Sequence, residues 1–121
     1  MTSFPVEVVL KGRDYAVTET VVVPHGAPTT WDEAAVRDVL TETLRAIDRV
    51  QNPKAPTDRQ VVLTGFSWIV EPEGDRVVIA IEIPMGAAVA GPFDIPQAQL
   101  DGLISRTIQF ERMKSAPTTV H

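Results

Sequence analysis

The chain has 121 residues, of which 44% are hydrophobic and 22% charged, the size and composition of one globular domain. Its net charge of −5 and its scattered lysines and arginines argue against binding to nucleic acid, which requires clustered basic side chains. The lack of cysteine excludes disulfides and thiol chemistry, and with no signal-peptide pattern and no apolar run of membrane length we expect a cytoplasmic protein that binds no membrane.

Two β-branched segments, residues 4–10 and 15–23, predict a first pair of strands joined by a turn at residues 12–13. Directly opposed residues in such a hairpin share one face of the sheet. The face that should be buried carries the opposed pairs Leu10–Tyr15, Val8–Val17 and Phe4–Val21. Glu19 is the one charged residue on that face.

A first helix is predicted to follow a Pro-x-Gly-Ala segment at residues 24–27. Thr30 and Glu33 have the spacing of a capping box, so we expect Thr30 to be the N-cap. Apolar residues then recur at helical spacing, and the helix should end before Pro53. This stripe consists of Val36, Val39, Leu40, Leu44, Ile47 and Val50. Trp31 either packs on the sheet or is an exposed anchor at an interface.

A second pair of strands is predicted on the two sides of a turn at residues 73–74. In that register the opposed pairs on the core face are Val70–Val77, Trp68–Ile79 and Phe66–Ile81. Because successive side chains of a strand point to opposite faces, we expect Phe66 and Trp68 in the core and Ser67 outside it.

A second Pro-x-Gly-Ala segment opens residues 86–94, which are predicted to be a loop. This loop either has no special role or folds over a ligand. The second helix is predicted to begin near Asp94, with Pro96 in its first turn and Gln97 in the capping-box position. Its core stripe consists of Leu100, Leu103, Ile104 and Ile108.

The order strand–strand–helix, found twice, predicts an α+β two-layer sandwich (ββαββα) in which a four-stranded antiparallel sheet carries both helices on one face. We expect one domain over residues 1–121, with a flexible tail at residues 114–121. Residues 4–51 and 59–113 then form two ββα units on either side of a polar connector. Internal duplication and ordinary α+β architecture both account for this order.

The second face of the predicted sheet has no helix to cover it. A solvated antiparallel face normally alternates to polar side chains. This face instead mixes small residues with apolar ones, a pattern typical of association surfaces. The residues predicted to form the interface are Val9, Val22, Leu63, Ile69 and Val78.

Three residues are candidates for catalysis: Glu19, His25 and Glu82. Glu19 is either a buried general acid or base, or the partner of an arginine such as Arg106. His25 precedes a helix and could move a proton or bind an anion, or be an exposed loop residue. Glu82 could form an ion pair across an interface. No nucleophile–base–orienter set accompanies them.

Three glycines beside the predicted loops, Gly26, Gly86 and Gly91, are candidates for ligand binding. Gly86 and Gly91 have the glycine spacing of a phosphate loop, but no Lys-Ser/Thr follows. With two histidines and no His-x-x-x-His spacing, the sequence predicts no metal site and no cofactor.

Two functions remain. The first is a non-catalytic interaction or adaptor protein that acts as a homodimer or binds another protein. The second is a small-ligand-binding protein or enzyme with a pocket near the two Pro-x-Gly-Ala loops. The second function predicts that Glu19, His25 and Glu82 meet in one cleft with Arg13 or Arg106, whereas the first allows them to be scattered.

Overall fold

The computed structural model describes residues 1–54 and 61–115. The described residues form an antiparallel sheet of five strands and two α-helices, so the predicted α+β class is confirmed. The elements are β1 (Thr2–Leu10), β2 (Val17–Val23), the 3-10 helix η1 (Pro28–Thr30), α1 (Glu33–Gln51), β3 (Ser67–Glu73), β4 (Arg76–Ile83), β5 (Gly86–Phe93) and α2 (Gln97–Ser115).

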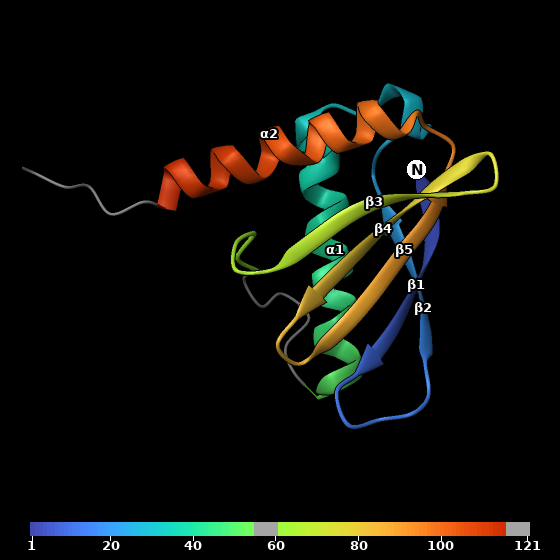
Figure 1. Ribbon diagram of the computed structural model, residues 1–121, viewed down its shortest axis with the longest axis vertical. Coiled ribbons are helices and arrows are strands. Elements are labelled where there is room, and N and C mark those ends of the chain that lie inside the picture. Colours follow the sequence, from blue (N-terminus) through green and yellow to red (C-terminus); the bar gives the residue numbers. More distant parts are fainter. Residues whose placement is uncertain (55–60, 116–121) are drawn as a thin grey trace, which may run out of the picture.

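The sheet has the strand order β2-β1-β5-β4-β3, so the last strand in sequence lies at its centre (Figure 1). The sequence predicted four strands and assigned residues 86–94 to a loop, and this assignment is wrong. β5 pairs with β1 on one side and β4 on the other and joins the two hairpins into one sheet.

Two glycines allow β5 to occupy this central position. A Cβ at Gly86 would overlap the carbonyl oxygen of Val9, because the backbones of β1 and β5 approach closely there. Gly91 has a φ of +118° and lies at the irregularity where β5 carries an extra residue opposite β4. Such bulges place a glycine where other residues would be strained. Gly86 and Gly91 therefore have a structural role in the sheet.

The register of the first hairpin is confirmed, with Val8 opposite Val17 and Phe4 opposite Val21. β2, however, begins at Val17, and the side chain of Tyr15 is 55% exposed. Tyr15 therefore does not contribute to the core face as predicted.

The second hairpin is displaced from the prediction by two positions. Its turn contains Gly74 and Asp75, and Val70 pairs with Ile79 rather than Val77. Gly74 has a φ of +64°, which suits a tight hairpin turn. A displacement of two residues leaves every side chain on its predicted face, because strand periodicity is two. Phe66 and Trp68 accordingly pack against the core, although they are only partly buried, and Ser67 is exposed.

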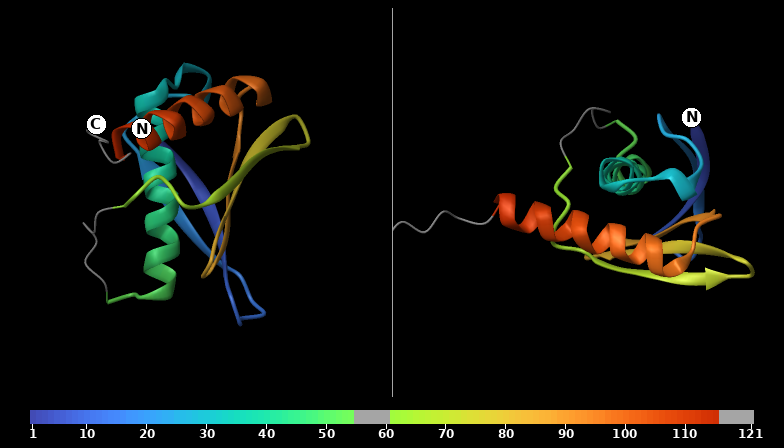
Figure 2. Two further views of the ribbon diagram at one scale, coloured as in Figure 1. Left: turned by 60° about the vertical axis from the view of Figure 1, so that its left-hand side comes forward. Right: turned by 90° about the horizontal axis from the view of Figure 1, so that it is seen from above.

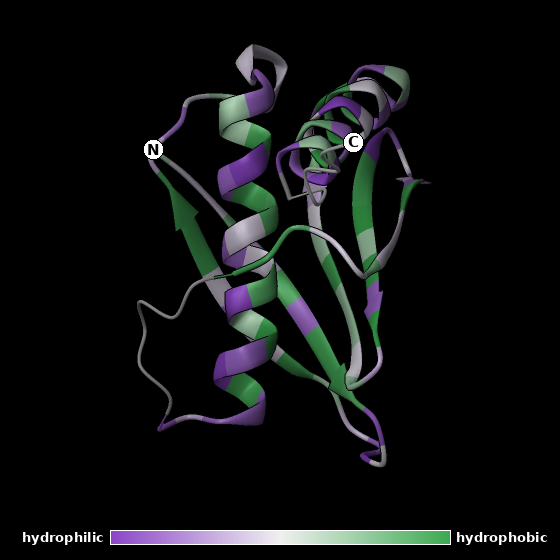
Figure 3. Cartoon of the chain, turned by 90° about the vertical axis from the view of Figure 1, so that its left-hand side faces the viewer, coloured by the Kyte–Doolittle hydropathy of each residue, from purple (hydrophilic) through white to green (hydrophobic). Residues whose placement is uncertain are grey.

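Helix α1 begins at Glu33, and its N-cap is Asp32 rather than the predicted Thr30. The carboxylate of Asp32 accepts a hydrogen bond of 2.9 Å from the backbone N–H of Ala35. Thr30 instead ends η1, where its hydroxyl donates to the carbonyl of Ala27. Hydrophobic and hydrophilic residues alternate along α1, and its apolar stripe faces the sheet (Figure 3).

Helix α2 begins at Gln97, three residues later than predicted. The backbone N–H of Leu100 donates to the carbonyl of Pro96, and the side chain of Gln97 donates to the carbonyl of Val70 in β3. This contact ties the start of α2 to the sheet. Of the predicted tail, residues 114 and 115 belong to α2, and residues 116–121 lie outside the described part of the chain.

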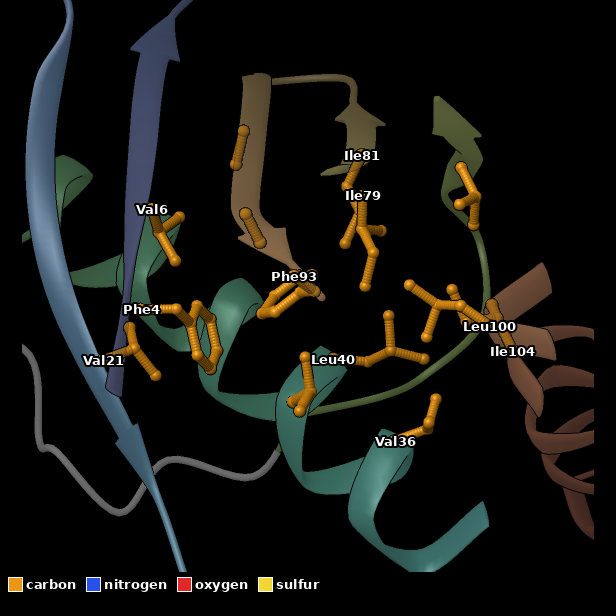
Figure 4. Packing of buried hydrophobic residues seen from close by; sticks show 14 of the residues in the cluster. Phe4, Val6, Val21, Val36, Leu40, Ile79, Ile81, Phe93, Leu100 and Ile104 are labelled. Atoms are coloured by element: carbon orange, nitrogen blue, oxygen red, sulfur yellow. The ribbon is translucent and has the colours of Figure 1, made fainter. Parts of the chain in front are cut away.

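The core lies between the sheet and the two helices, which contact one another with α2 running across the end of α1 (Figures 1 and 2). Phe93 stands at its centre, between Phe4 on β1 and Leu40 on α1 (Figure 4). The rings of Phe4 and Trp31 meet the ring of Phe93 edge-on, at 4.9 and 5.2 Å between centroids. Trp31 therefore packs inside, 5% exposed. All four residues of the predicted α2 stripe are buried.

The two Pro-x-Gly-Ala segments have different structural roles. The first follows β2 and leads into η1, whereas the second is the turn between β4 and β5. The two halves consequently read ββα and βββα. The second predicted repeat starts at residue 59, outside the described residues, and an origin by duplication stays a prediction.

Candidate functional site

The sheet face turned away from both helices carries no other described element, and we call it the open face. Its apolar and small residues are Val9, Val22, Ile69, Ala80, Ala87 and Val89. The side chains of Val9, Val22, Ile69 and Val89 are 39%, 50%, 52% and 40% exposed. Ile69, Ala80 and Val89 are direct neighbours across β3, β4 and β5, and Val9 lies beside Ala87 in the next row, so these five residues form an apolar band. Val22, opposite Ser3 near the other end of β1, lies apart from this band.

Two residues predicted for this interface lie elsewhere or are less accessible. Leu63 belongs to the segment before β3 and is buried in the core, 4% exposed. Val78 points outward, opposite Glu71, but is only 7% exposed beside the bulge of β5. Val89 was missed because residues 86–94 were assigned to a loop.

A hollow of about 340 Å³ lies in the open face, and we call it the face hollow. Its lining includes Ile69 on β3, Ala80 and Glu82 on β4, and Ala87 and Val89 on β5. The small side chains of Ala80 and Ala87 leave this space between larger neighbours. A side chain entering the hollow would meet mostly apolar surface, with one carboxylate beside it.

The charges of the open face are mostly acidic. They belong to the carboxylates of Glu7, Glu71, Glu73 and Glu82, and Arg76, directly opposite Glu73, adds a cation near the β3–β4 turn. None of these four carboxylates forms an ion pair with a described residue. By contrast, the ion pairs of the described chain involve α1, α2 or the loop before them. The open face thus combines an apolar band with a net negative charge.

A second hollow, of about 550 Å³, lies at the end of the sheet beside the turn that follows β1. Its lining includes the cations of Lys11 and Arg13, the carboxylate of Glu82 and the residues Pro84 and Gly86 of the β4–β5 turn. The second Pro-x-Gly-Ala segment therefore borders a hollow.

The two Pro-x-Gly-Ala loops lie at opposite ends of β1. The hydroxyl of Thr2, at its start, donates to the carbonyls of His25 and Gly26. The backbone N–H of Lys11, just after its end, donates to the carbonyl of Met85 at 2.8 Å. A strand rises about 3.3 Å per residue, so the nine residues of β1 hold the loops far apart. One pocket cannot include both loops.

The candidate catalytic residues likewise do not converge. Nε2 of His25 lies 2.7 Å from the carboxylate of Asp38 on α1. Glu19 pairs with Arg49 of α1, Nε to Oε1 at 3.0 Å, and not with Arg106 as suggested by the sequence. Glu82 borders the two hollows. Each carboxylate or imidazole thus has its own surroundings, and the single cleft expected of an enzyme built on these residues is not formed.

The carbonyl of Gly26 accepts hydrogen bonds from the indole N–H of Trp31 and from the hydroxyl of Thr2. These contacts fasten the loop after β2 to the start of β1. No group of three or more His, Cys, Asp or Glu side chains suited to a metal ion occurs among residues 1–54 and 61–115. No helix in the same part of the chain is long and apolar enough to cross a membrane.

No protein-family model matches the chain, and the searches of curated proteins and of solved structures found no similar protein.

Proposed function

We propose that this protein is a non-catalytic interaction protein that binds a second copy of itself through the open face. The observation that carries the proposal is the exposed apolar band, in which residues such as Ile69 and Val89 stay accessible beside the face hollow. Contiguous apolar surface of this kind usually marks an association site. Homo-oligomers are the commonest assemblies of soluble proteins, so a second copy is the natural partner.

The scattered positions of Glu19, His25 and Glu82 support a binding role over a catalytic one. Catalysis by such groups requires a base within hydrogen-bond reach of the group that it activates. His25 contacts a carboxylate, but no described nucleophilic side chain forms a hydrogen bond with its ring. The contact between His25 and Asp38 joins the loop after β2 to α1, which is a structural use of both side chains.

Light scattering at tens of micromolar tests the proposal. We expect the wild-type mass to exceed the 13.2 kDa of one chain. Ile69→Arg should shift the protein to monomer, because it places a charge within the apolar band. Val62→Arg is the matched control, since Val62 is 64% exposed but lies outside the open face. A wild-type monomer, or an Ile69→Arg variant that still associates, would contradict the proposal.

A second candidate function is the binding of a small anion in the 550 Å³ hollow. The observation that favours it is the presence of Lys11 and Arg13 in the same lining. Thermal unfolding with millimolar phosphate, citrate and small carboxylic acids tests this candidate. Stabilisation by one of them that disappears in Arg13→Ser would support it, and the absence of stabilisation by all of them would count against it.

A further inference from the structure

The C-terminal end of α2 extends beyond the sheet (Figures 1 and 2). On this end the side chains of Phe110 and Met113 are 53% and 71% exposed. Residues three positions apart are neighbours on a helix surface. The guanidinium of Arg37 lies 5.3 Å from the centroid of the Phe110 ring, but the pair is otherwise largely exposed.

The same end of α2 is basic. Arg112 and Lys114 lie in its last turn, and neither forms an ion pair within the described residues. Earlier in the helix the charges are satisfied, since Arg106 pairs with Glu33 and Glu111 with Arg37. The overhanging end thus combines exposed apolar side chains with two cations.

The open face has the opposite character, an apolar band with a net negative charge from four glutamates and one arginine, Arg76. Two open faces stacked on one another would bring like charges together, which disfavours that arrangement. An occupant with apolar side chains and positive charge is favoured instead. The end of α2 meets both requirements, and every copy of the chain carries it.

We propose that the end of α2 of a second copy occupies the open face, with Phe110 and Met113 against the face hollow and Arg112 and Lys114 beside Glu71 and Glu82. This inference rests on the proposed function. The mostly apolar lining of the hollow, with Ala80 and Ala87 among its residues, provides room for a large side chain. The carboxylate of Glu82 borders the hollow, so Arg112 or Lys114 of the docked α2 would lie beside it.

Such a contact joins two different surfaces and is heterologous. Each copy then offers one helix end and one open face. A heterologous contact continues from copy to copy unless a ring closes. Association should therefore pass beyond the dimer as the concentration rises.

The lack of cysteine makes disulfide trapping a direct test. Full-length Ile69→Cys and Met113→Cys variants are mixed, oxidised and separated by non-reducing electrophoresis. We expect a two-chain species that contains both variants, at least about tenfold more abundant than in a mixture of Val62→Cys with Met113→Cys. Trapping of Ile69→Cys with itself as the main product would indicate stacked open faces and overturn the inference.

Charge reversal provides an independent test by light scattering. Glu71→Lys/Glu82→Lys and Arg112→Glu/Lys114→Glu should each raise the dissociation constant at least about tenfold, because like charges then face each other. The chain with all four substitutions should associate again. Lys54→Glu is the control for net charge, since Lys54 lies outside both surfaces. Circular dichroism checks that each variant is folded.

The possible results separate the two proposals. A wild-type monomer overturns both of them. Wild-type association that Ile69→Arg abolishes but Arg112→Glu/Lys114→Glu leaves unchanged overturns only the placement of α2. Failure of the four-substitution chain to regain association overturns the proposed charge pairing. Association of that chain, together with the mixed disulfide species, supports the inference.

Discussion

Gly86→Ala should destabilise the protein through the centre of its sheet. The substituted Cβ would overlap the carbonyl oxygen of Val9 and lie 3.0 Å from Cα of Leu10. These are backbone atoms of the paired strand, so they cannot move aside as the end of a flexible side chain could. Relief requires β1 and β5 to separate locally, which strains the hydrogen bond between Lys11 and Met85.

The magnitude follows from two opposing contributions. Overpacking of this kind costs about 1–3 kcal/mol, and the loss of glycine's freedom in the unfolded chain returns about 0.4–1 kcal/mol. A net loss of about 1.3 kcal/mol, divided by an unfolding entropy of about 2.1 cal/mol/K per residue over 121 residues, lowers the Tm by about 5 °C.

Gly26→Ala is the matched control for this measurement. A Cβ at Gly26 meets only the hydroxyl of Thr30, at an ordinary 3.5 Å. We expect this variant to be unchanged or stabilised by up to about 1 kcal/mol. Urea denaturation measures the free energy of unfolding of both variants and of the wild type. Equal free energies of unfolding for Gly86→Ala and wild type would refute the close approach of β1 and β5.

Two further predictions concern the helix cap and the core. Asp32→Ala should lower the free energy of unfolding by about 1 kcal/mol because it removes the N-cap of α1, and Thr30→Ala should lower it less. The opposite ranking in urea denaturation would show that the capping box forms. Phe93→Ala should lower the free energy of unfolding by about 3–5 kcal/mol because this ring is 2% exposed, and Tyr15→Ala should leave it almost unchanged. Comparable losses for the two variants in thermal unfolding would contradict the described core.

The amphipathic elements were predictable from the sequence because their patterns are local. The first hairpin has a β-branched alternation that fixes its faces, and its register is as predicted. The stripe of α2 has helical spacing, and its four residues are buried. The second hairpin shows the limit of such reasoning. Its faces were predicted, but the choice between two turns differing by one position required the conformation of Gly74.

β5 could not be predicted because its sequence lacks the usual residues of a strand. Ala, Gly and Pro are depleted in strands, and they make up six of the eight residues of β5. This segment forms a strand because of its position between β1 and β4, beneath the helices. Its small residues fit the limited space there. Tertiary packing thus outweighed local propensity.

The candidate site was only partly predictable. Val9, Val22 and Ile69 were correctly placed on the open face by alternation along the strands. The sequence could not show that Leu63 lies in the core, because its segment is not a strand. The glutamates of β3 were visible as alternate residues, but their lack of an ion pair with a described residue required the structure.

The central place of β5 has a consequence for how the chain acquires its structure during synthesis. Val6 pairs with Ala90, 84 positions later, so one side of β1 lacks its final neighbour until nearly the whole chain has emerged from the ribosome. Contacts between such distant residues close large loops and slow folding. Until then the N-terminal hairpin exposes an unpaired strand edge, the kind of surface that chaperones bind and that promotes aggregation. We therefore expect nascent chains that stop before residue 86 to depend on chaperones far more than the complete protein does.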